Sequence, residues 1–388
     1  MKCEWKDVEL SEVADLTVGF VGTMASHYTD KGVLFLRSTN IEPFNIKFDD
    51  VKYISPEFNE TIKKSQLNSD DVVIVRTGKP GACTVIPQKA EPWNCSDLVI
   101  IHPNKDKINP HFLASYVNLA SGVINAHLVG AVQQHFNVGA AKKMKIPLPS
   151  IDAQNRIVSI VCDINYKIEL NNKINDNLQQ QAKSLYEEMF LNNPDADMVS
   201  GTLSDIATIT MGQSPSGSSY NEDSIGEVFY QGRAEFGFRF PTRRLFTTEP
   251  KRMAEPGDVL LSVRAPVGDL NVAYEKCCIG RGLGAIHSKT GASSFMLYTM
   301  FALKPQLDVF NGEGTVFGSI NRDGLSNLPV NIPSAEEIAK FEAVVRPMDN
   351  LIRTNYEEIC RLQSIRDNLL PKLMSGEIDV SGHPALSR

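Results

Sequence analysis

The chain has 388 residues, of which 42% are hydrophobic and 22% charged, and its formal net charge is −7. This composition is typical of a folded protein of two or three domains and excludes a disordered chain. No apolar run is long enough for a membrane span and the start lacks a signal peptide, which predicts a cytoplasmic protein. Seven cysteines without a Cys-x-x-Cys pair favour a reducing compartment and indicate neither disulfides nor a zinc site.

The first part of the chain is predicted to be a mixed domain of strands and helices. Asp71–Val75 and Leu98–Ile101 are short runs rich in β-branched residues, which is typical of buried strands. His111–Ala120 follows an Asn-Pro pair and is predicted to be a helix.

A long helix is predicted next, because seam residues follow a strict 4-3 spacing for more than four heptads. Such a repeat is the pattern of a coiled coil. The seam residues are Ile157, Val161, Ile164, Ile168, Asn171, Asn175, Leu178, Ala182, Leu185 and Met189. From Ala153 to Phe190 the pattern spans 38 residues, about 57 Å at 1.5 Å per residue.

The second half of the chain repeats the first. Asp258–Val263 matches the strand Asp71–Val75, and Ser293–Ala302 is predicted to be a helix. From Pro149 and Pro333 onward the two copies keep a constant separation of 184 residues, whereas the earlier parts differ in length. The second seam therefore reads Phe341, Val345, Met348, Ile352, Asn355, Ile359, Leu362, Arg366, Leu369 and Leu373. A variable globular domain followed by a helix of fixed length is thus present twice.

The two helices are expected to pair antiparallel, because the short link Val330–Pro333 cannot lead the chain back to the far end of the first helix. Ser334 and Glu337 form a capping box at the start of the second helix. Pro347 is expected to kink this helix or to split off its first turns, and Ser375-Gly376 to end it.

Asn171 and Asn355 occupy the same seam position near the midpoints of the two helices. Since midpoints meet in an antiparallel pair, we predict that these two residues face each other and fix the coiled-coil register. Solvated asparagines on a splayed seam are the alternative.

These patterns predict an α+β fold. Two globular mixed α/β domains, residues 1–150 and 200–333, are separated by an antiparallel two-helix coiled coil with an internal pseudo-twofold repeat. The two long helices are expected within residues 151–195 and 334–376.

This arrangement resembles the specificity subunit of Type I restriction-modification systems. Three kinds of segment carry the resemblance: an entry into the first conserved helix, a Gly-x-x-Pro-Ser loop, and a strand followed by Arg and Gly. They are Ile146–Val158, Gly212–Ser216, and the pair Asp71–Gly81 and Asp258–Gly268.

The resemblance implies that residues 1–150 and 200–333 are target recognition domains, each reading one half of an asymmetric, bipartite site in double-stranded DNA. The coiled coil would set the spacer length and dock two methyltransferase subunits, and the restriction/translocase subunits would join through that complex. The chain itself would be non-catalytic and hold no cofactor. S-adenosylmethionine and ATP are expected on the partner subunits.

Motif inspection predicts no catalytic residue and no metal site in this chain. Asn109–Phe112 approaches a methyltransferase motif, but His111 replaces the second proline that the motif needs. Thr77–Gly81 lacks the upstream glycine of a phosphate loop, and the histidines show no ligand spacing. A repeat-built scaffold without a DNA role, or a fused enzyme fragment, is the alternative interpretation.

Candidate DNA contacts are of three kinds. Four arginines and a neighbouring lysine follow strand-like runs, where a scaffold displays its readout groups. One arginine lies in the glycine-rich loop 280–284, and three lie among phenylalanines in residues 236–244. Arginine can pair bidentately with guanine or hold a phosphate. The predicted contacts are Arg37, Arg76, Lys79, Arg233, Arg239, Arg243, Arg244, Arg264 and Arg281. The alternative is a surface salt bridge or, for the aromatic segment around Arg239, a strand with an apolar inner face. Because the long helices are acidic, the isolated chain is expected to bind DNA weakly and to need the methyltransferase.

Overall fold

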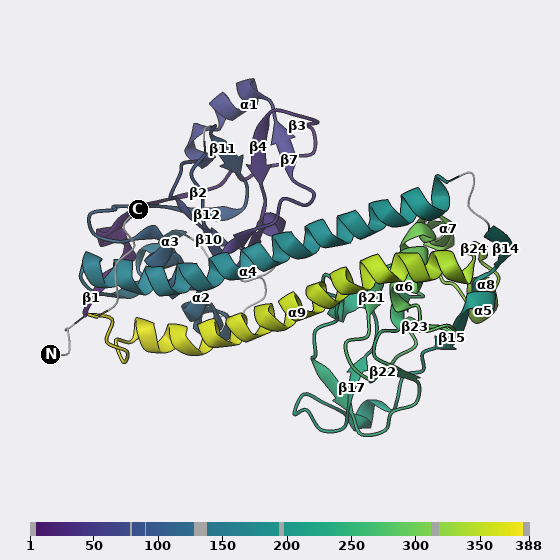
Figure 1. Cartoon of the computed structure of the whole chain (residues 1–388). Helices are drawn as coiled ribbons and strands as arrows, with labels where there is room; N and C mark the ends of the chain where they lie inside the picture. The colour runs from purple at the N-terminus through teal and green to yellow at the C-terminus, as the bar shows by residue number, and fades with distance from the viewer. Residues whose placement is uncertain are drawn as a thin grey trace. The chain divides into compact units, whose positions relative to one another are not determined.

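The computed structural model describes residues 5–77, 80–89, 91–127, 138–193, 198–311 and 318–382. The chain forms two compact units, and Figure 1 labels many of their elements. Unit 1 comprises Met1–Leu170 and Glu358–Arg388, and unit 2 comprises Asn171–Glu357. Each unit therefore holds one globular domain together with half of each long helix. The predicted domain limits at the ends of the long helices stay a prediction.

Unit 1 is built on two main sheets. The four-stranded sheet has the order β10-β9-β12-β2, and the five-stranded sheet the order β3-β7-β4-β11-β8. Two short pairs, β1 with β13 and β5 with β6, complete it. The strands are β1 Lys6–Glu9, β2 Ala14–Val18, β3 Tyr28–Thr29, β4 Val33–Leu36, β5 Ile41–Glu42, β6 Asn45–Ile46, β7 Lys52–Ile54, β8 Gln66–Leu67, β9 Val72–Val75, β10 Cys83–Val85, β11 Trp93–Cys95, β12 Leu98–Pro103 and β13 Lys145–Leu148. The α-helices before α4 are α1 Pro56–Thr61, α2 Pro110–His127 and α3 Val138–Lys142.

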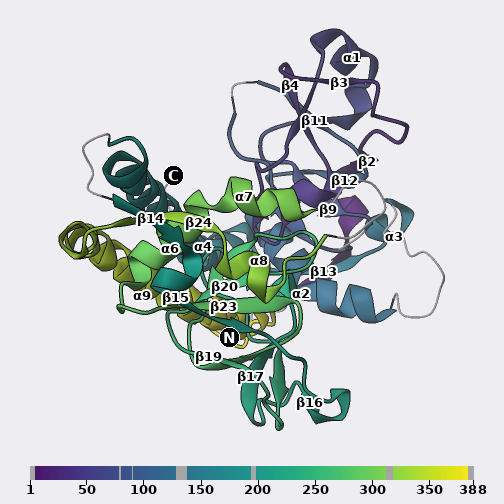
Figure 2. The same ribbon diagram turned by 90° about the vertical axis from the view of Figure 1, so that its right-hand side faces the viewer.

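Unit 2 is built in the same way. Its four-stranded sheet has the order β15-β23-β20-β21, its five-stranded sheet the order β16-β18-β17-β22-β19, and β14 pairs with β24. Figure 2 shows β15, β20 and β23 near one another, with β16, β17 and β19 beyond them. The strands are β14 Met198–Thr202, β15 Ala207–Met211, β16 Tyr220–Asn221, β17 Glu227–Tyr230, β18 Leu245–Thr247, β19 Met253–Ala254, β20 Val259–Ser262, β21 Leu270–Val272, β22 Cys277–Ile279, β23 Leu283–Ser288 and β24 Pro329–Pro333. The helices are α5 Leu203–Ile206, α6 Ser293–Ala302, α7 Lys304–Asp308 and α8 Arg322–Ser326.

The repeat in the sequence is therefore also a repeat of topology. In both units the central strand of the four-stranded sheet, β9 or β20, pairs antiparallel with two neighbours. In both units the five-stranded sheet contains one parallel pair, β4 with β11 or β17 with β22. The predicted strands over Asp71–Val75 and Asp258–Val263 and the predicted helices over His111–Ala120 and Ser293–Ala302 are confirmed.

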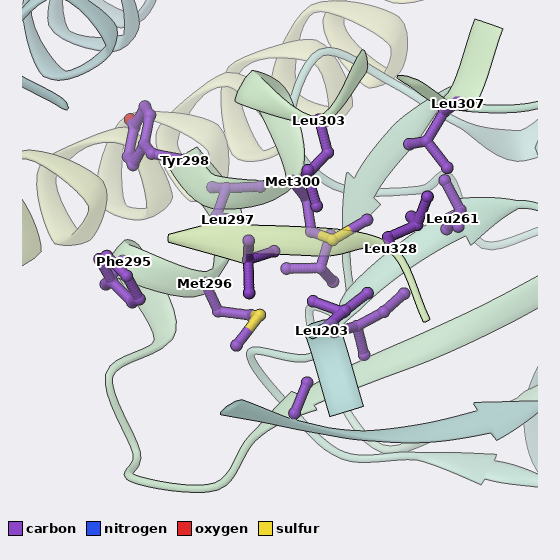
Figure 3. Close-up of a cluster of buried hydrophobic side chains, with 14 of the residues drawn as sticks. Leu203, Leu261, Phe295, Met296, Leu297, Tyr298, Met300, Leu303, Leu307 and Leu328 are labelled. Carbon is purple, nitrogen blue, oxygen red and sulfur yellow. The ribbon is translucent and has the colours of Figure 1, made fainter. Parts of the chain in front are cut away.

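The central strands are apolar except for Ser262 at the end of β20, because both of their faces are covered. Val72 and Ile74 of β9 belong to one buried cluster, and Val73 and Val75 to another. In β20, Val259 and Leu261 point into one cluster and Leu260 into the other. Figure 3 shows part of the cluster that contains Val259 and Leu261. Leu261 comes from β20, Leu203 from α5, and Leu297 and Met300 from α6. Its packing joins the sheet to the helices of unit 2.

The two long helices are α4 Ile151–Tyr186, which continues into the π-helical turn Glu187–Leu191, and α9 Ala335–Met374. Within unit 1, Ile157 and Val161 of α4 share a core with Leu370 and Leu373 of α9. The side chains of Asn165 and Arg366 hydrogen-bond there at 3.1 Å, and Lys167 lies 3.3 Å from Glu358. Residue numbers thus rise along α4 while they fall along α9, so the helix segments are antiparallel.

Within unit 2 the later half of α4 meets the earlier half of α9 in the same antiparallel sense. Tyr186 of α4 packs edge-on against Phe341 of α9, with ring centroids 5.7 Å apart. Further along, the side chain of Asn355 donates to Asn175 Oδ1 at 2.8 Å. The predicted partner, Asn171, lies one helical turn before Asn175 and is also buried. Its role in setting the register stays a prediction.

The ends and the continuity of α9 follow from a few residues. The backbone N–H of Glu337 donates to Ser334 Oγ at 3.3 Å, which satisfies one of the first donors of the helix. After Met374 the chain turns at Gly376, whose φ of +70° suits glycine. The helix is not split at Pro347, contrary to that part of the prediction. Pro347 is exposed, so water can reach the backbone carbonyl that the proline leaves without a donor.

Candidate nucleic-acid interface

Three arginines of unit 2 follow strands that end at one place. β17 and β22 are parallel, with Tyr230 opposite Ile279, so the connections that leave them start at the same edge of the sheet. Arg233 lies in the first of these connections and Arg281 in the second. Arg264 follows β20, the strand that pairs with β23 immediately after the Arg281 turn.

Gly282 is the point at which the three connections meet. Its N–H donates to the carbonyl of Gln231 at 3.3 Å, and its own carbonyl accepts from the N–H of Val263 at 3.0 Å. A Cβ on Gly282 would lie 2.8 Å from the Gln231 oxygen, so this close approach requires glycine. Arg233, Arg264 and Arg281 each lie within two residues of these contacts. We call them the strand-end cluster of unit 2.

The strand-end cluster of unit 2 carries a positive excess. Arg233 is paired with Asp269. Arg264 and Arg281 are exposed, and neither side chain has an ionic partner among the residues that the structure describes. Two guanidinium groups are therefore available to an external anion or to a base edge.

The corresponding edge of unit 1 has a different charge. β4 and β11 are parallel, with Leu36 opposite Cys95, and Arg37 and Arg76 directly follow β4 and β9. The connection between β11 and β12, which corresponds to the one that carries Arg281, holds Asp97 instead. Asp97 Oδ1 lies 3.8 Å from Arg76 Nη1, and its other oxygen accepts from the Thr77 hydroxyl.

Arg37, Arg76 and Asp97 form the strand-end cluster of unit 1, in which acid and base are mixed. Arg37 Nη2 lies 2.9 Å from Asp50 Oδ2. Hydrogen bonds from Lys52 and then from Arg37 lower the pKa of Asp50 to about 2. Sequence inspection missed Asp97, because only the strand pairing shows that it takes the place of Arg281. Lys79, the remaining candidate here, lies outside the described residues.

The aromatic and basic segment of unit 2 is the connection between β17 and β18, residues 231–244, which we call the anchor loop. Residues 236–244 contain no strand, so the alternative interpretation of this segment was wrong. Arg243 pairs with Glu275, and Arg244 with Glu235, whose side chain is 3% exposed. Phe238 is 46% exposed. The outer part of the loop thus keeps its cations at the surface, each beside a carboxylate.

Arg239 does not fit the prediction that it contacts DNA. Its side chain is 4% exposed, and its Nη1 lies 2.6 Å from Asp349 Oδ1. Its Nη2 donates to Gln179 Oε1 at 3.1 Å and to the Tyr298 hydroxyl at 3.2 Å. Alternation with phenylalanines in the sequence could not distinguish this buried guanidinium from its exposed neighbours. Arg239 is therefore left out of the proposed DNA contacts.

The described part of the chain holds no group of three or more His, Cys, Asp or Glu side chains arranged to bind a metal ion. Its helices also include none with the length and apolar character needed to cross a bilayer.

Comparison with known proteins identifies the family. The family model for the Type I restriction modification DNA specificity domain matches residues 2–180 and 196–361. The chain belongs to this family. The two matched segments cover both globular domains, so this specificity subunit carries two DNA-recognition domains.

Individual relatives of the specificity subunit agree with the family assignment. The putative type I restriction enzyme MjaX specificity subunit of Methanocaldococcus jannaschii is 28% identical over 410 aligned residues, covering 97% of this chain and 94% of the relative. The MjaVIII specificity subunit of the same organism is 20% identical and is matched over 82% of each chain. The solved S subunit of a Type I system from M. genitalium, 14% identical, shares the fold with a TM-score of 0.58 over 99% of this chain and 97% of that chain.

Proposed function

We propose that the specificity subunit reads a bipartite, asymmetric DNA site, one half with the recognition domain of each unit. The observation that carries the proposal is the duplicated strand-end cluster. One scaffold displays Arg37, Arg76 and Asp97 in unit 1 but Arg233, Arg264 and Arg281 in unit 2. Two edges with the same backbone and different side chains are suited to two different short sequences, since arginine favours guanine and a carboxylate accepts from cytosine.

The long helices form an antiparallel coiled coil that sets the spacer between the half-sites, and the two halves of the chain are related by a pseudo-twofold axis. The antiparallel contacts within each unit and the buried bond between Asn175 and Asn355 support this role. The 36 residues of α4 correspond to about 54 Å of helix. Half-sites one helical turn apart in DNA are separated by about 34–36 Å, which a spacer of this size can bridge.

Methyltransferase subunits dock on the outer faces of these helices. Tyr166 on α4 is 63% exposed, and Val344 and Leu351 on α9 are 50% and 45% exposed. Val344 and Leu351 are one heptad apart and so lie on one face of α9. Exposed apolar side chains on a long helix favour a protein partner. In this proposal two methyltransferase subunits carry S-adenosylmethionine, restriction subunits with ATP join through them, and the chain itself performs no catalysis.

The proposal is tested by co-expressing the chain with the methyltransferase subunit of its own system and sequencing the host DNA for methylated adenine. The expected result is one split motif with two unlike halves and a fixed spacer. Host DNA without the chain, but with the methyltransferase, is the control. Complete methyltransferase complexes that produce no split motif would favour the scaffold interpretation instead.

Single variants show which recognition domain reads which half of the DNA motif. Arg264→Ala should relax the requirement at a position in one half of the motif, and Arg76→Ala at a position in the other half. A good bidentate pair discriminates against the wrong base by about 1–3 kcal/mol, so relaxed positions should be visible in the methylation pattern. Changes by both variants in the same half would contradict the assignment of one half to each domain.

A further inference from the structure

One buried side chain of the anchor loop, that of Arg239, connects the loop to the helices of unit 2. Arg239 extends from the loop and reaches three helices of unit 2 at once: Asp349 on α9, Gln179 on α4 and Tyr298 on α6. The Tyr298 hydroxyl also donates to Asp349 Oδ1 at 3.1 Å, which closes the network. Tyr298 is 1% exposed and Arg239 4% exposed, so the bond between these two side chains is shielded from water.

The charge on Arg239 is retained in this position. Burial alone would lower the pKa of the guanidinium, but the charge of Asp349 and the Tyr298 hydroxyl outweigh it, and the pKa is raised. A planar guanidinium with its donors in fixed directions suits a site that must fix orientation. A buried charge whose partner is lost is strongly unfavourable, so the network favours a single arrangement of loop and helices.

A second contact fixes the same loop on α9. Phe240 is 5% exposed and packs against Tyr356 of α9 and Tyr274, with ring centroids 5.0 Å and 5.5 Å apart. Asp349 and Tyr356 are one heptad apart, so both anchoring points lie on one face of α9. Arg353, between them, donates to the backbone carbonyl of Tyr274 at 3.1 Å.

The anchor loop also carries three of the candidate DNA contacts, Arg233, Arg243 and Arg244. Its position relative to α4 and α9 therefore decides where these cations lie along the helices. A connection of this length without strands would otherwise have many conformations.

We infer that Arg239 is a positioning residue that couples the recognition surface of unit 2 to both long helices and thereby restricts the spacer length at which the second half-site is read. The inference rests on the proposed function. It concerns the tolerance of spacing and not the identity of the bases, because the side chain of Arg239 is 4% exposed and its Nη atoms are bonded within unit 2.

The first test uses the link to α4 alone. Gln179→Ala removes one of the two acceptors of Arg239 Nη2 and leaves the bonds to Tyr298 and Asp349 in place. Gln180→Ala, at the next and exposed position, is the matched control. In the complex with methyltransferase, hydrogen exchange of backbone amides in residues 236–244 should be faster in Gln179→Ala than in Gln180→Ala. Equal exchange in the two variants would overturn the coupling.

The second test measures spacing directly. Methylation rates are compared on synthetic duplexes that contain the native motif or the same half-sites with one base pair added to or removed from the spacer. Arg239→Met with Asp349→Met removes both charges together, which avoids an unpaired buried ion. The ratio of the native rate to the altered-spacer rate should fall by about tenfold in this variant, since loosened positioning weakens discrimination.

The outcomes separate the two proposals. A wild-type complex that methylates no split motif contradicts the proposed function. A wild-type complex that does so, with an unchanged spacing ratio in the double variant at an unchanged melting temperature, contradicts the inference about Arg239. If the double variant unfolds, the ratio of the native rate to the altered-spacer rate is measured in Gln179→Ala and in Gln180→Ala. We expect a lower ratio in Gln179→Ala. Equal ratios in the two variants would overturn the inference.

Discussion

A buried carboxylate holds a histidine at the same place in each unit. Asp71 Oδ1 lies 2.7 Å from His102 Nδ1 in unit 1, and Asp258 Oδ1 lies 2.5 Å from His287 Nδ1 in unit 2. The second oxygen of each aspartate accepts from a backbone N–H three residues earlier. Each aspartate thus ties the turn before the central strand to the strand beside it.

The pair in unit 1 makes stability depend on pH. The hydrogen bond that His102 donates to the Asp71 carboxylate raises the pKa of His102 despite partial burial, and the charges of Asp71 and Asp15 add to the increase. Because the folded-state pKa is raised, this stabilisation is present below pH about 6.5 and is lost as pH rises through the folded-state pKa. It is worth on the order of 1 kcal/mol for one hydrogen bond.

We expect an NMR titration of the chain with labelled histidine to place the His102 pKa above 6.5, the ordinary value for histidine. His102→Gln identifies the resonance, and Asp71→Asn is the informative variant, since it keeps the histidine but removes its partner. In Asp71→Asn the pKa of His102 should fall. A His102 pKa that does not change in Asp71→Asn would mean that the carboxylate is not the cause.

At the scale of the element, polar side chains interrupt the apolar seam of the helix pair. Asn175 and Asn355 are 3% and 7% exposed and satisfy each other through one hydrogen bond of 2.8 Å. A buried amide without a partner is costly, whereas two apolar side chains of similar size are not. The asparagine pair therefore favours one register over alternatives that would leave either amide unpaired.

Asn355→Leu alone should destabilise unit 2 by about 1–3 kcal/mol, because the amide of Asn175 loses its partner in a buried site. The double variant Asn175→Leu with Asn355→Leu should recover most of this loss. The coupling is measured by chemical denaturation of the wild-type chain, the two single variants and the double variant. Thr354→Leu, at a neighbouring exposed position, is the control for added apolar surface. Strictly additive effects of the two substitutions would contradict the pairing.

At the scale of the whole molecule, the charge does not favour DNA. The formal net charge is −7, and most candidate arginines already lie beside carboxylates such as Asp50, Asp269 and Glu275. When a DNA phosphate replaces the carboxylate beside one of these arginines, one ion pair is exchanged for another, so little binding free energy is gained. Strong binding therefore needs additional phosphate contacts, which a partner subunit can supply.

The isolated chain should bind its own motif only in the non-specific range, with a Kd of about 10⁻⁴–10⁻⁶ M at physiological salt. Adding the methyltransferase should bring the Kd to about 10⁻⁸ M or below, with a steeper dependence on salt. Fluorescence anisotropy of a labelled duplex, with a duplex of scrambled half-sites as control, measures both. Specific binding with a nanomolar Kd by the chain alone would contradict this view of how affinity is divided.

The sequence alone determined the features that depend on local pattern. The duplication, the central strands β9 and β20 and the two long helices could all be predicted, because periodicity and turn residues act over short distances. The same reasoning could not decide which seam asparagines meet, since a shift of one turn preserves the pattern.

Only the tertiary structure decided which side chains come together. Arg239 and Arg243 are similar in sequence context, yet one is buried among three helices and the other is exposed, because burial depends on elements far away in the chain. Asp97 was recognisable as the counterpart of Arg281 only once the parallel pairing of β11 with β4 in unit 1, and of β22 with β17 in unit 2, was known. Strand pairing and helix packing are long-range contacts, and one sequence does not specify their partners residue by residue.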